Sequence, residues 1–464
     1  MRYASRSGRW VVAATVLGSG VAFLDSTVVN VALPSIARDL HSGLSDLQWI
    51  SDAYLLTLGA LIILGGALGD RYGRRRVFVF GLVSFTAASM VCGLAPNTLI
   101  LILARGLQGI GGALLVPGSL AIISACFVPG DRARAVGLWS GMSGVVTAGG
   151  PFIGGWLVDS VSWRAIFFIN VPVAALAVWI AVRHVPETRD TSATGHPDYV
   201  GAVTISLGLA GLVYLLIDGP ANGWPVMTVV AGAAGASLLL AFPFLERRTR
   251  APMVPLRIFS SRQFTGANLT TFAVYAALSA TLFLLVLHLQ QDLHYSALQA
   301  GLATIPVSVF LSLLSAQAGA LAQRIGPRLP MTLGPVVAAV GVLLFAGVRP
   351  GDSYWVSVLP GVVVFGMGLT LLVAPLTAAV MAAVDAHNLG VGSAINNATA
   401  RIGGLIAVAV VPALAGLTAA SSHLAGVSLN DGFTSAMRIS AGMLVAGAGI
   451  AALTIRRIAP ADGG

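Results

Sequence analysis

Long runs of apolar residues, interrupted by very few charges, fill almost the whole of this chain. Of its 464 residues, 56% are hydrophobic and only 9% are charged, whereas a soluble domain carries about 25% charged residues. So few charges cannot cover the water-facing surface of a chain this long. The sequence therefore predicts a polytopic membrane protein, and its 55 glycines suit closely packed membrane helices.

A helix that crosses a bilayer needs about 20 mostly apolar residues. Fourteen segments of the chain meet this requirement, so we expect an all-α protein with 14 transmembrane helices. The segments lie near residues 10–33, 49–68, 77–95, 98–126, 135–158, 163–183, 199–217, 226–245, 264–289, 297–321, 330–348, 353–382, 391–418 and 433–455.

The arginines favour one orientation of these helices. All 26 basic residues are arginines, and with a cytoplasmic N-terminus the inner segments hold 20 of them. The outer segments then hold only Arg38, Arg164, Arg349 and Arg438. A missed or added span would spoil this positive-inside bias. We therefore predict that both termini are cytoplasmic, and that the net charge of +9 reflects topology rather than nucleic-acid binding.

The chain also repeats itself weakly. GALGDRYGRR at 66–75 returns as GALAQRIGPR at 319–328, 253 residues later, and GIGGALLVP at 109–117 resembles GMGLTLLVAP at 366–375. Paired halves indicate a transporter with its substrate site between them. We predict an N-terminal six-helix bundle at 1–183, a linker with two extra transmembrane helices at 184–262, and a C-terminal six-helix bundle at 263–464, a 6 + 2 + 6 plan.

Two charged residues lie deep inside predicted spans. Asp25 is eight residues before the outer end of its span and Arg105 is about seven residues into its own, so both lie about 10–12 Å deep at 1.5 Å per residue. A desolvated carboxylate binds a proton more readily and a nearby arginine opposes this, so we predict a proton-coupling site. The alternative is a static ion pair. Asp52 lies nearer the outer surface, as a second proton or cation site or as a solvated interface residue.

Other polar groups are candidates for supporting roles. Asp70 stands among arginines and glycines in the loop after the second predicted span. A carboxylate there that forms an ion pair in one conformational state only would bias the conformational equilibrium. The residues of this loop motif are Gly66, Asp70, Arg71, Gly73, Arg74 and Arg75. The alternative is that these arginines only enforce topology. His288 and Asp292 suggest a metal site or, preferably, an interfacial polar cluster.

Four stretches, in order, resemble motifs of the major facilitator superfamily. The loop 66–75 resembles motif A, LILARGLQGIGGA (101–113) resembles motif B, GGPFIGG (149–155) resembles motif C, and LDSTVVNVALP (24–34) is similar to a motif of the 14-helix drug:H⁺ antiporters. WRAIFFINVP (163–172) is also typical of that family. One glycine usual in motif C is Val146 here. The resemblance covers the whole chain, and methylenomycin-resistance-type efflux proteins are the most similar in character.

This resemblance implies a proton-coupled exporter of lipophilic or amphipathic drugs or antibiotics, in the inner (plasma) membrane. The helices of Asp25 and Arg105 would line one cavity, and the polar patch of Asn396, Asn397 and Arg401 would receive the motif A loop or form a polar vestibule. Motif C implies a functional kink, or else small-residue packing, at Gly150, Pro151, Gly154 and Gly155.

Two other functions remain as alternatives, a proton-coupled importer on the same fold and, more remotely, an intramembrane enzyme. Motif C argues against import, and the spans contain no HExxH or Ser/His pattern that would indicate an enzyme. We expect a monomer in the lipid bilayer that binds a small lipophilic molecule and needs no cofactor, metal or nucleic acid, only a proton gradient.

Overall fold

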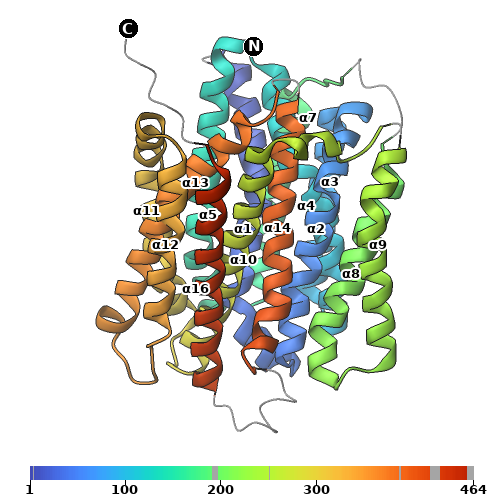
Figure 1. Ribbon diagram of the computed structural model, residues 1–464. Coiled ribbons are helices and arrows are strands. Elements are labelled where there is room, and N and C mark those ends of the chain that lie inside the picture. The colour runs from blue at the N-terminus through green and yellow to red at the C-terminus, as the bar shows by residue number, and fades with distance from the viewer. Residues whose placement is uncertain (4, 191–196, 250, 386–387, 418–428, 457–464) are drawn as a thin grey trace. The chain divides into compact units, whose positions relative to one another are not determined.

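The computed structural model describes residues 1–456 except 4, 191–196, 250, 386–387 and 418–428 (Figure 1). Two of the predicted inner arginines, Arg250 and Arg457, and residue 418 at the end of a predicted span lie outside this described part. The regular elements of the described part are all helical. They are α1 (Arg6–Leu40), α2 (Leu44–Tyr72), α3 (Arg74–Leu94), α4 (Thr98–Cys126), α5 (Pro129–Ser160), α6 (Ala165–Phe168), α7 (Asn170–His184), α8 (Tyr199–Asn222), α9 (Val226–Arg248), η1 (Leu256–Ser260), α10 (Arg262–Gln291), α11 (Ala297–Ile325), α12 (Arg328–Phe345), η2 (Tyr354–Val358), α13 (Leu359–Ala382), α14 (Leu389–Leu414) and α16 (Leu429–Thr454).

The expected number of membrane-crossing helices is confirmed. Among the described residues, 13 helices are long and apolar enough to span a bilayer, with α6–α7 and η2–α13 each counted as one. The remaining helix, α5, has 32 residues, well above the required length of about 20 residues. Its mean hydropathy is lowered by Arg132 and Arg134 near its start and by its many glycines. With α5 the count reaches fourteen.

Short polar side chains begin several of these helices. Asn97 precedes α4 and accepts a hydrogen bond from the Ile100 N–H at 3.0 Å, and Ser261 precedes α10 and accepts one from the Phe264 N–H at 3.3 Å. Asp46 in the first turn of α2 accepts from the Gly43 N–H at 2.9 Å. Such caps satisfy backbone donors that the helix itself leaves unpaired.

The predicted single helix at 163–183 is interrupted. It forms α6 and α7, which meet at Ile169. Pro172 has no N–H to donate to the Phe168 carbonyl, so the helical hydrogen-bond ladder is broken at that position. The same effect operates before α13, where Pro360 follows the π-helical turn η2. Sequence reasoning missed the break between α6 and α7. This break places Asn170 at the start of α7.

The chain divides into two compact units. The first comprises Met1–Leu212, Ala231–Val254 and Ser296–Leu298, and the second comprises Val213–Val230, Pro255–Tyr295 and Gln299–Gly464. In the first unit, α4 packs on α2 and α3, and α1 packs on α5 and α7. In the second unit, α13 packs on α12, and α10 packs on α14 and α16 (Figure 1). The three pairings of the second unit repeat the α4–α3, α1–α5 and α1–α7 pairings of the first.

Close backbone contacts confirm that the two units share one packing scheme. Gly111 of α4 lies so close to α3 that an added Cβ would be 2.6 Å from the Phe85 nitrogen, and Gly368 of α13 lies so close to α12 that its Cβ would be 2.3 Å from the Ala338 nitrogen. Phe85 and Ala338 are 253 residues apart, the same interval as the repeated loop motif. The weak sequence repeat therefore reflects a structural repeat.

Candidate functional site

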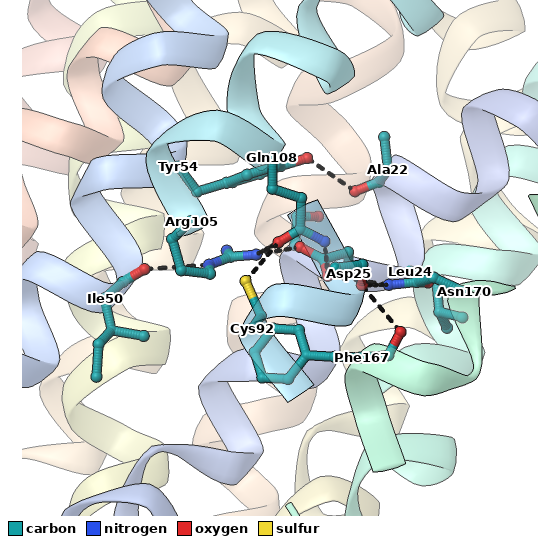
Figure 2. Close-up of polar contacts among 12 residues, drawn as sticks. Ala22, Leu24, Asp25, Ile50, Tyr54, Cys92, Arg105, Gln108, Phe167 and Asn170 are labelled. Atoms are coloured by element: carbon teal, nitrogen blue, oxygen red, sulfur yellow. Dashed lines mark hydrogen bonds and ion pairs between the residues drawn. The ribbon is translucent and has the colours of Figure 1, made fainter. Parts of the chain in front are cut away.

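Asp25 lies in the interior of the first unit, on α1, and none of its surface is exposed. Its carboxylate nevertheless has three hydrogen-bond donors from other helices (Figure 2). Oδ2 accepts a hydrogen bond from Arg105 Nη1. Oδ1 accepts from Gln108 Nε2 at 2.8 Å and from Asn170 Nδ2 at 3.2 Å. The carboxylate therefore joins α1 to both α4 and α7.

Arg105 on α4 is the partner that the sequence predicts for Asp25, and only 2% of its surface is exposed. Besides the ion pair with Asp25, its Nε donates to the Ile50 carbonyl of α2 at 3.2 Å and its Nη1 donates to Gln108 Oε1 at 2.7 Å. The guanidinium also lies over the Tyr54 ring, 4.3 Å from its centroid, a cation–π contact. Arginine is well suited to this position because its planar fork donates in several directions.

Gln108 and Asn170 belong to this site, although sequence reasoning did not assign them to it. Gln108 stands three residues after Arg105, a spacing that places two side chains on one helix face. That spacing was available from the sequence. Asn170 depends on the break between α6 and α7, and it also donates to Ser89 Oγ of α3 at 3.0 Å. Ser89 in turn donates to the Phe167 carbonyl at 2.9 Å.

This arrangement is energetically costly to disturb. A buried ion pair repays the loss of hydration only when its remaining hydrogen-bonding groups are satisfied, and removing one partner leaves an uncompensated charge. Here both carboxylate oxygens are bonded, and the guanidinium has three partners of different kinds besides Asp25. Protonation of Asp25 would cancel the ion pair while leaving the neutral donors Gln108 and Asn170 in place.

Asp52, the second predicted proton site, is separate from this network. It lies on α2 with no exposed surface, and neither of its carboxylate oxygens has a hydrogen-bond partner in the described part of the chain. The reading of Asp52 as a solvated interface residue is therefore wrong, because the helix continues for eight residues before it, from Leu44, and neighbouring helices cover it. An ionised carboxylate in such a place is very costly without a partner.

The glycines of motif C pack against the helix that carries Asp25. A Cβ on Gly150 would lie 1.9 Å from Thr27 Oγ1, and one on Gly154 would lie 3.0 Å from Val28 Cβ. Both contacts fall within one turn of Asp25 on α1. Pro151 lies inside α5, which continues as one helix to Ser160, and Gly155 is buried. Close packing of α5 on α1 is thus a property of this stretch.

The comparisons with known proteins agree with this fold. A family model described as the Major Facilitator Superfamily matches residues 15–408 and, in a second match, 267–463. The chain belongs to the Major Facilitator Superfamily. The second match begins near the start of α10, as expected for a protein built from repeated halves.

Curated relatives within the superfamily are named for drug resistance and export. The multidrug resistance protein Stp of Mycobacterium tuberculosis is 36% identical over 403 residues, covering 86% of this chain and 74% of the relative. The probable actinorhodin transporter of Streptomyces coelicolor is 34% identical, covering 88% of this chain and 72% of the relative. The methylenomycin A resistance protein of Bacillus subtilis is 34% identical, with 89% of each chain covered.

Solved structures share the fold at much lower identity. The in meso crystal structure of the POT family transporter PepTSo has a TM-score of 0.73 and 13% identity, with 97% of each chain covered. Such a likeness shows the fold alone, which is that of a superfamily transporter.

The motif A loop of this superfamily member binds the segment that follows α7. Asp70 pairs with Arg74 one turn later at 2.7 Å. The carboxylate of Glu187 accepts hydrogen bonds from the Arg75 and Arg76 N–H groups at 3.1 and 3.2 Å. Gly73 makes the turn possible, with φ of 109° and a position where a Cβ would lie 2.7 Å from Glu187 Oε1. Sequence reasoning missed Glu187, although an acid shortly after a helix that returns to the arginine-rich face was a usable signal.

The remaining elements of motif A have definite places. Gly66 is on α2 near Pro117 of α4, Arg71 lies in the last turn of α2, and the Arg75 side chain donates to the Val185 carbonyl at 3.2 Å. The loop between α2 and α3 is therefore fastened to the segment that follows α7.

In the second unit, the predicted polar patch joins two helices. Asn396 of α14 donates to Asn268 Oδ1 at 3.2 Å and to Thr271 Oγ1 at 2.7 Å, both on α10. Asn397 and Arg401 lie half-buried on the same helix. The structure thus assigns one member of the patch a contact within the second unit.

His288 is buried near the end of α10. Its ring stacks on Phe433 with centroids 3.9 Å apart, and Nδ1 lies 2.6 Å from Asp292 Oδ2. Nε2 lies 3.3 Å from the Val348 carbonyl. These contacts tie α10 to α16 and to the loop after α12. Among the described residues, no group of three metal-ligating side chains forms.

Proposed function

We propose that this protein is a proton-coupled antiporter that exports lipophilic or amphipathic drugs or antibiotics across the plasma membrane by alternating access. The observation that carries the proposal is the buried Asp25–Arg105 pair, held by Gln108 and Asn170. An ionisable pair inside a membrane bundle is costly and is a functional-site hypothesis by default. The names of the curated relatives support the direction and the class of substrate.

Protonation of Asp25 is the coupling step that this geometry supports. In the ionised state Asp25 holds α1 against α4 through Arg105. A bound proton removes the charge attraction but leaves the neutral hydrogen bonds from Gln108 and Asn170, so α1 is held less strongly against α4 and can shift at lower energetic cost. Arg105 then retains Gln108, the Ile50 carbonyl and the Tyr54 ring as partners, which prevents an isolated charge. Deprotonation restores the first arrangement.

The other predicted elements have supporting roles in this proposal. Asp52 binds a second proton, because its buried carboxylate has no partner that would favour the charged form. Motif C keeps α5 closely packed on α1 while the bundle changes shape. The motif A loop and the Asn397–Arg401 patch stabilise one of the two alternating states. Both termini are cytoplasmic, and the two extra helices lie in a linker at 184–262 between bundles at 1–183 and 263–464.

The proposed substrate is apolar over most of its surface. The interior contains few acids, which disfavours a strict requirement for dications. Neutral or zwitterionic natural products suit such an environment, where a few polar groups set the orientation of a largely apolar ligand. Neither proton movement nor substrate movement requires a covalent step, so the proposal includes no catalysis.

Transport in proteoliposomes with an imposed pH gradient tests the function directly. The full-length protein is reconstituted, and lipophilic antibiotics and dyes are screened for gradient-driven movement while an internal pH dye records proton flux. We expect the substrate to move against the proton flow and to increase that flow. The antiporter proposal fails if no compound moves and no compound changes the proton flux.

The same assay separates export from proton-coupled import, the second candidate. In symport the substrate accumulates on the side toward which protons flow, whereas in antiport it accumulates on the opposite side. The sign of the accumulation therefore decides between the two functions.

A further inference from the structure

Two acids at the base of the α8–α9 hairpin are not used by the proposed transport mechanism. Asp198 immediately precedes α8, and Glu246 lies in the last turn of α9, both within the first unit. Asp198 is 9% exposed and Glu246 is 2% exposed. Acidic side chains are rarely buried this far unless they are paired with another group. The pair therefore requires a partner of its own.

Each carboxyl group uses one oxygen to bind the backbone. Asp198 Oδ1 accepts the Gly201 N–H at 2.8 Å and so caps the first turn of α8. Glu246 Oε2 accepts the Val254 N–H at 3.1 Å, which fastens the segment after α9 to the end of that helix. Met253 and Val254 are both 8% exposed, so this segment is packed against the hairpin.

The other oxygen of each acid faces its counterpart. Asp198 Oδ2 and Glu246 Oε1 have no hydrogen-bond donor in the described part of the chain. Both point at the same position, because a Cβ on Gly201 would lie 2.6 Å from Asp198 Oδ2 and 2.7 Å from Glu246 Oε1. The absence of a side chain at Gly201 is what allows the two carboxyl groups to approach each other.

Among the residues that the structure describes, no basic side chain forms an ion pair with either acid. Asp198 is the charged side chain that acts directly on Glu246. On α9 the neighbouring Arg247 and Arg248 are exposed. On α8 the neighbouring Tyr199 is exposed, and its hydroxyl lies 3.4 Å from that of Tyr72. Two carboxylates in contact cannot both ionise without strong repulsion.

We propose that Asp198 and Glu246 form a proton-binding site, in which one proton held between Glu246 Oε1 and Asp198 Oδ2 closes the base of the α8–α9 hairpin onto Met253–Val254. A single proton supplies the hydrogen bond that both unpaired oxygens lack. When the proton leaves to solvent, the two negative charges repel each other and the Glu246 carboxylate releases the Val254 N–H. The site therefore makes the attachment of the inter-bundle segment dependent on pH, independently of proton coupling at Asp25.

Infrared difference spectroscopy of the full-length protein in lipid detects the proposed proton. Wild-type protein is titrated with base, and the same titration of Glu246→Gln and Asp198→Asn is subtracted. We expect a carboxylic acid C=O band that disappears on titration and is missing from both variants. Asp352→Asn, which changes an acid in the Arg349–Asp352 turn, retains the band. A wild-type spectrum with no band attributable to either residue overturns the proposal.

Hydrogen exchange at the Val254 amide provides a second readout. In wild-type protein we expect exchange to rise at least about tenfold beyond the intrinsic effect of pH once the proton leaves, because the amide loses its acceptor. Glu246→Gln places an amide donor opposite Asp198 and so replaces the proton, and its Val254 amide should stay protected at every pH. Protection that depends on Na⁺ at constant pH would show that a cation occupies the site and would overturn the proposal, as would identical pH profiles for the two proteins.

Discussion

The two halves of this transporter share one backbone scheme but fill corresponding interior positions with opposite chemistry. Close glycine contacts show that Gly111 of α4 corresponds to Gly368 of α13, and that Gly81 of α3 corresponds to Gly334 of α12. The other residues of these helices can be aligned from these two pairs. Four polar residues of the first unit then correspond to four buried apolar residues of the second: Ser89, Cys92, Arg105 and Gln108 correspond to Val342, Phe345, Val362 and Phe365.

One contact illustrates the exchange clearly. In the first unit the Cys92 thiol lies 3.7 Å from Gln108 Oε1, between α3 and α4. In the second unit the ring of Phe345 meets that of Phe365 edge to face, with centroids 6.3 Å apart, between α12 and α13. The same helix pair thus carries a polar network in one half and an ordinary apolar core in the other. This difference indicates that the repeat preserves helix packing, whereas the buried charges at these positions occur in the first unit.

The strongest test of this asymmetry is Asp25→Asn. The amide is nearly isosteric and still hydrogen-bonds, but it cannot carry a proton through a cycle, so gradient-driven transport should be abolished in the proteoliposome assay. Ser26→Ala on the same helix is the matched control, because the Ser26 hydroxyl donates to the Phe23 carbonyl of its own helix, and it should retain transport. Unchanged gradient-driven export in Asp25→Asn would remove Asp25 from the proton path.

Arg105→Val places the second unit's residue into the first. It leaves Asp25 buried without its counter-charge, so we expect a loss of stability of about 3–5 kcal/mol, measured by unfolding in mixed detergent and SDS micelles. Adding Asp25→Asn to this variant removes the stranded charge and should recover most of that loss. If Arg105→Val is as stable as the wild type, the pair contributes nothing to holding α1 on α4.

Gly111→Ala and Gly368→Ala test the close helix packing that the two halves share. In each, the new methyl group would meet backbone atoms at 2.6 or 2.3 Å, so both variants should lose about 1–3 kcal/mol, as overpacked cores do. Gly144→Ala is the control, since a Cβ there has nothing within 4 Å. A large effect at one glycine and none at the other would break the proposed equivalence.

The smallest expected change in stability comes from Asp70→Gln. Residue 323, which corresponds to Asp70 in the repeat, is a glutamine, and both loops turn on a glycine with positive φ, Gly73 and Gly326. The Asp70 side chain is 39% exposed, so loss of its pair with Arg74 should cost less than about 1 kcal/mol. Transport should nevertheless slow if the carboxylate stabilises one alternating state. Wild-type transport in this variant would restrict motif A to a structural role.

The sequence predicted the fold well because the spans depend on length and apolar composition, which are local properties. It also predicted the contact between Asp25 and Arg105, since depth along two straight helices can be counted. It did not assign Gln108 to the site, although the spacing from Arg105 was visible. The role of Asn170 could not be predicted from the sequence, because the position of its side chain depends on how α7, after the break near Pro172, packs on α1 and α3. Asp52 was misread for a related reason, since burial near a helix end is decided by neighbours distant in sequence.

Cys92 has a practical consequence, because its thiol is fully buried beside Gln108. A thiol reagent reaches it only when water enters the Asp25 network, so its labelling rate reports directly on the opening of the site. The other cysteine, Cys126, is 6% exposed and is the last residue of α4, and replacing it with serine leaves a single thiol. The labelling rate of Cys92 is thus a built-in measure of how often the site opens. The effects of substrate, of pH and of each variant above can be compared through this rate.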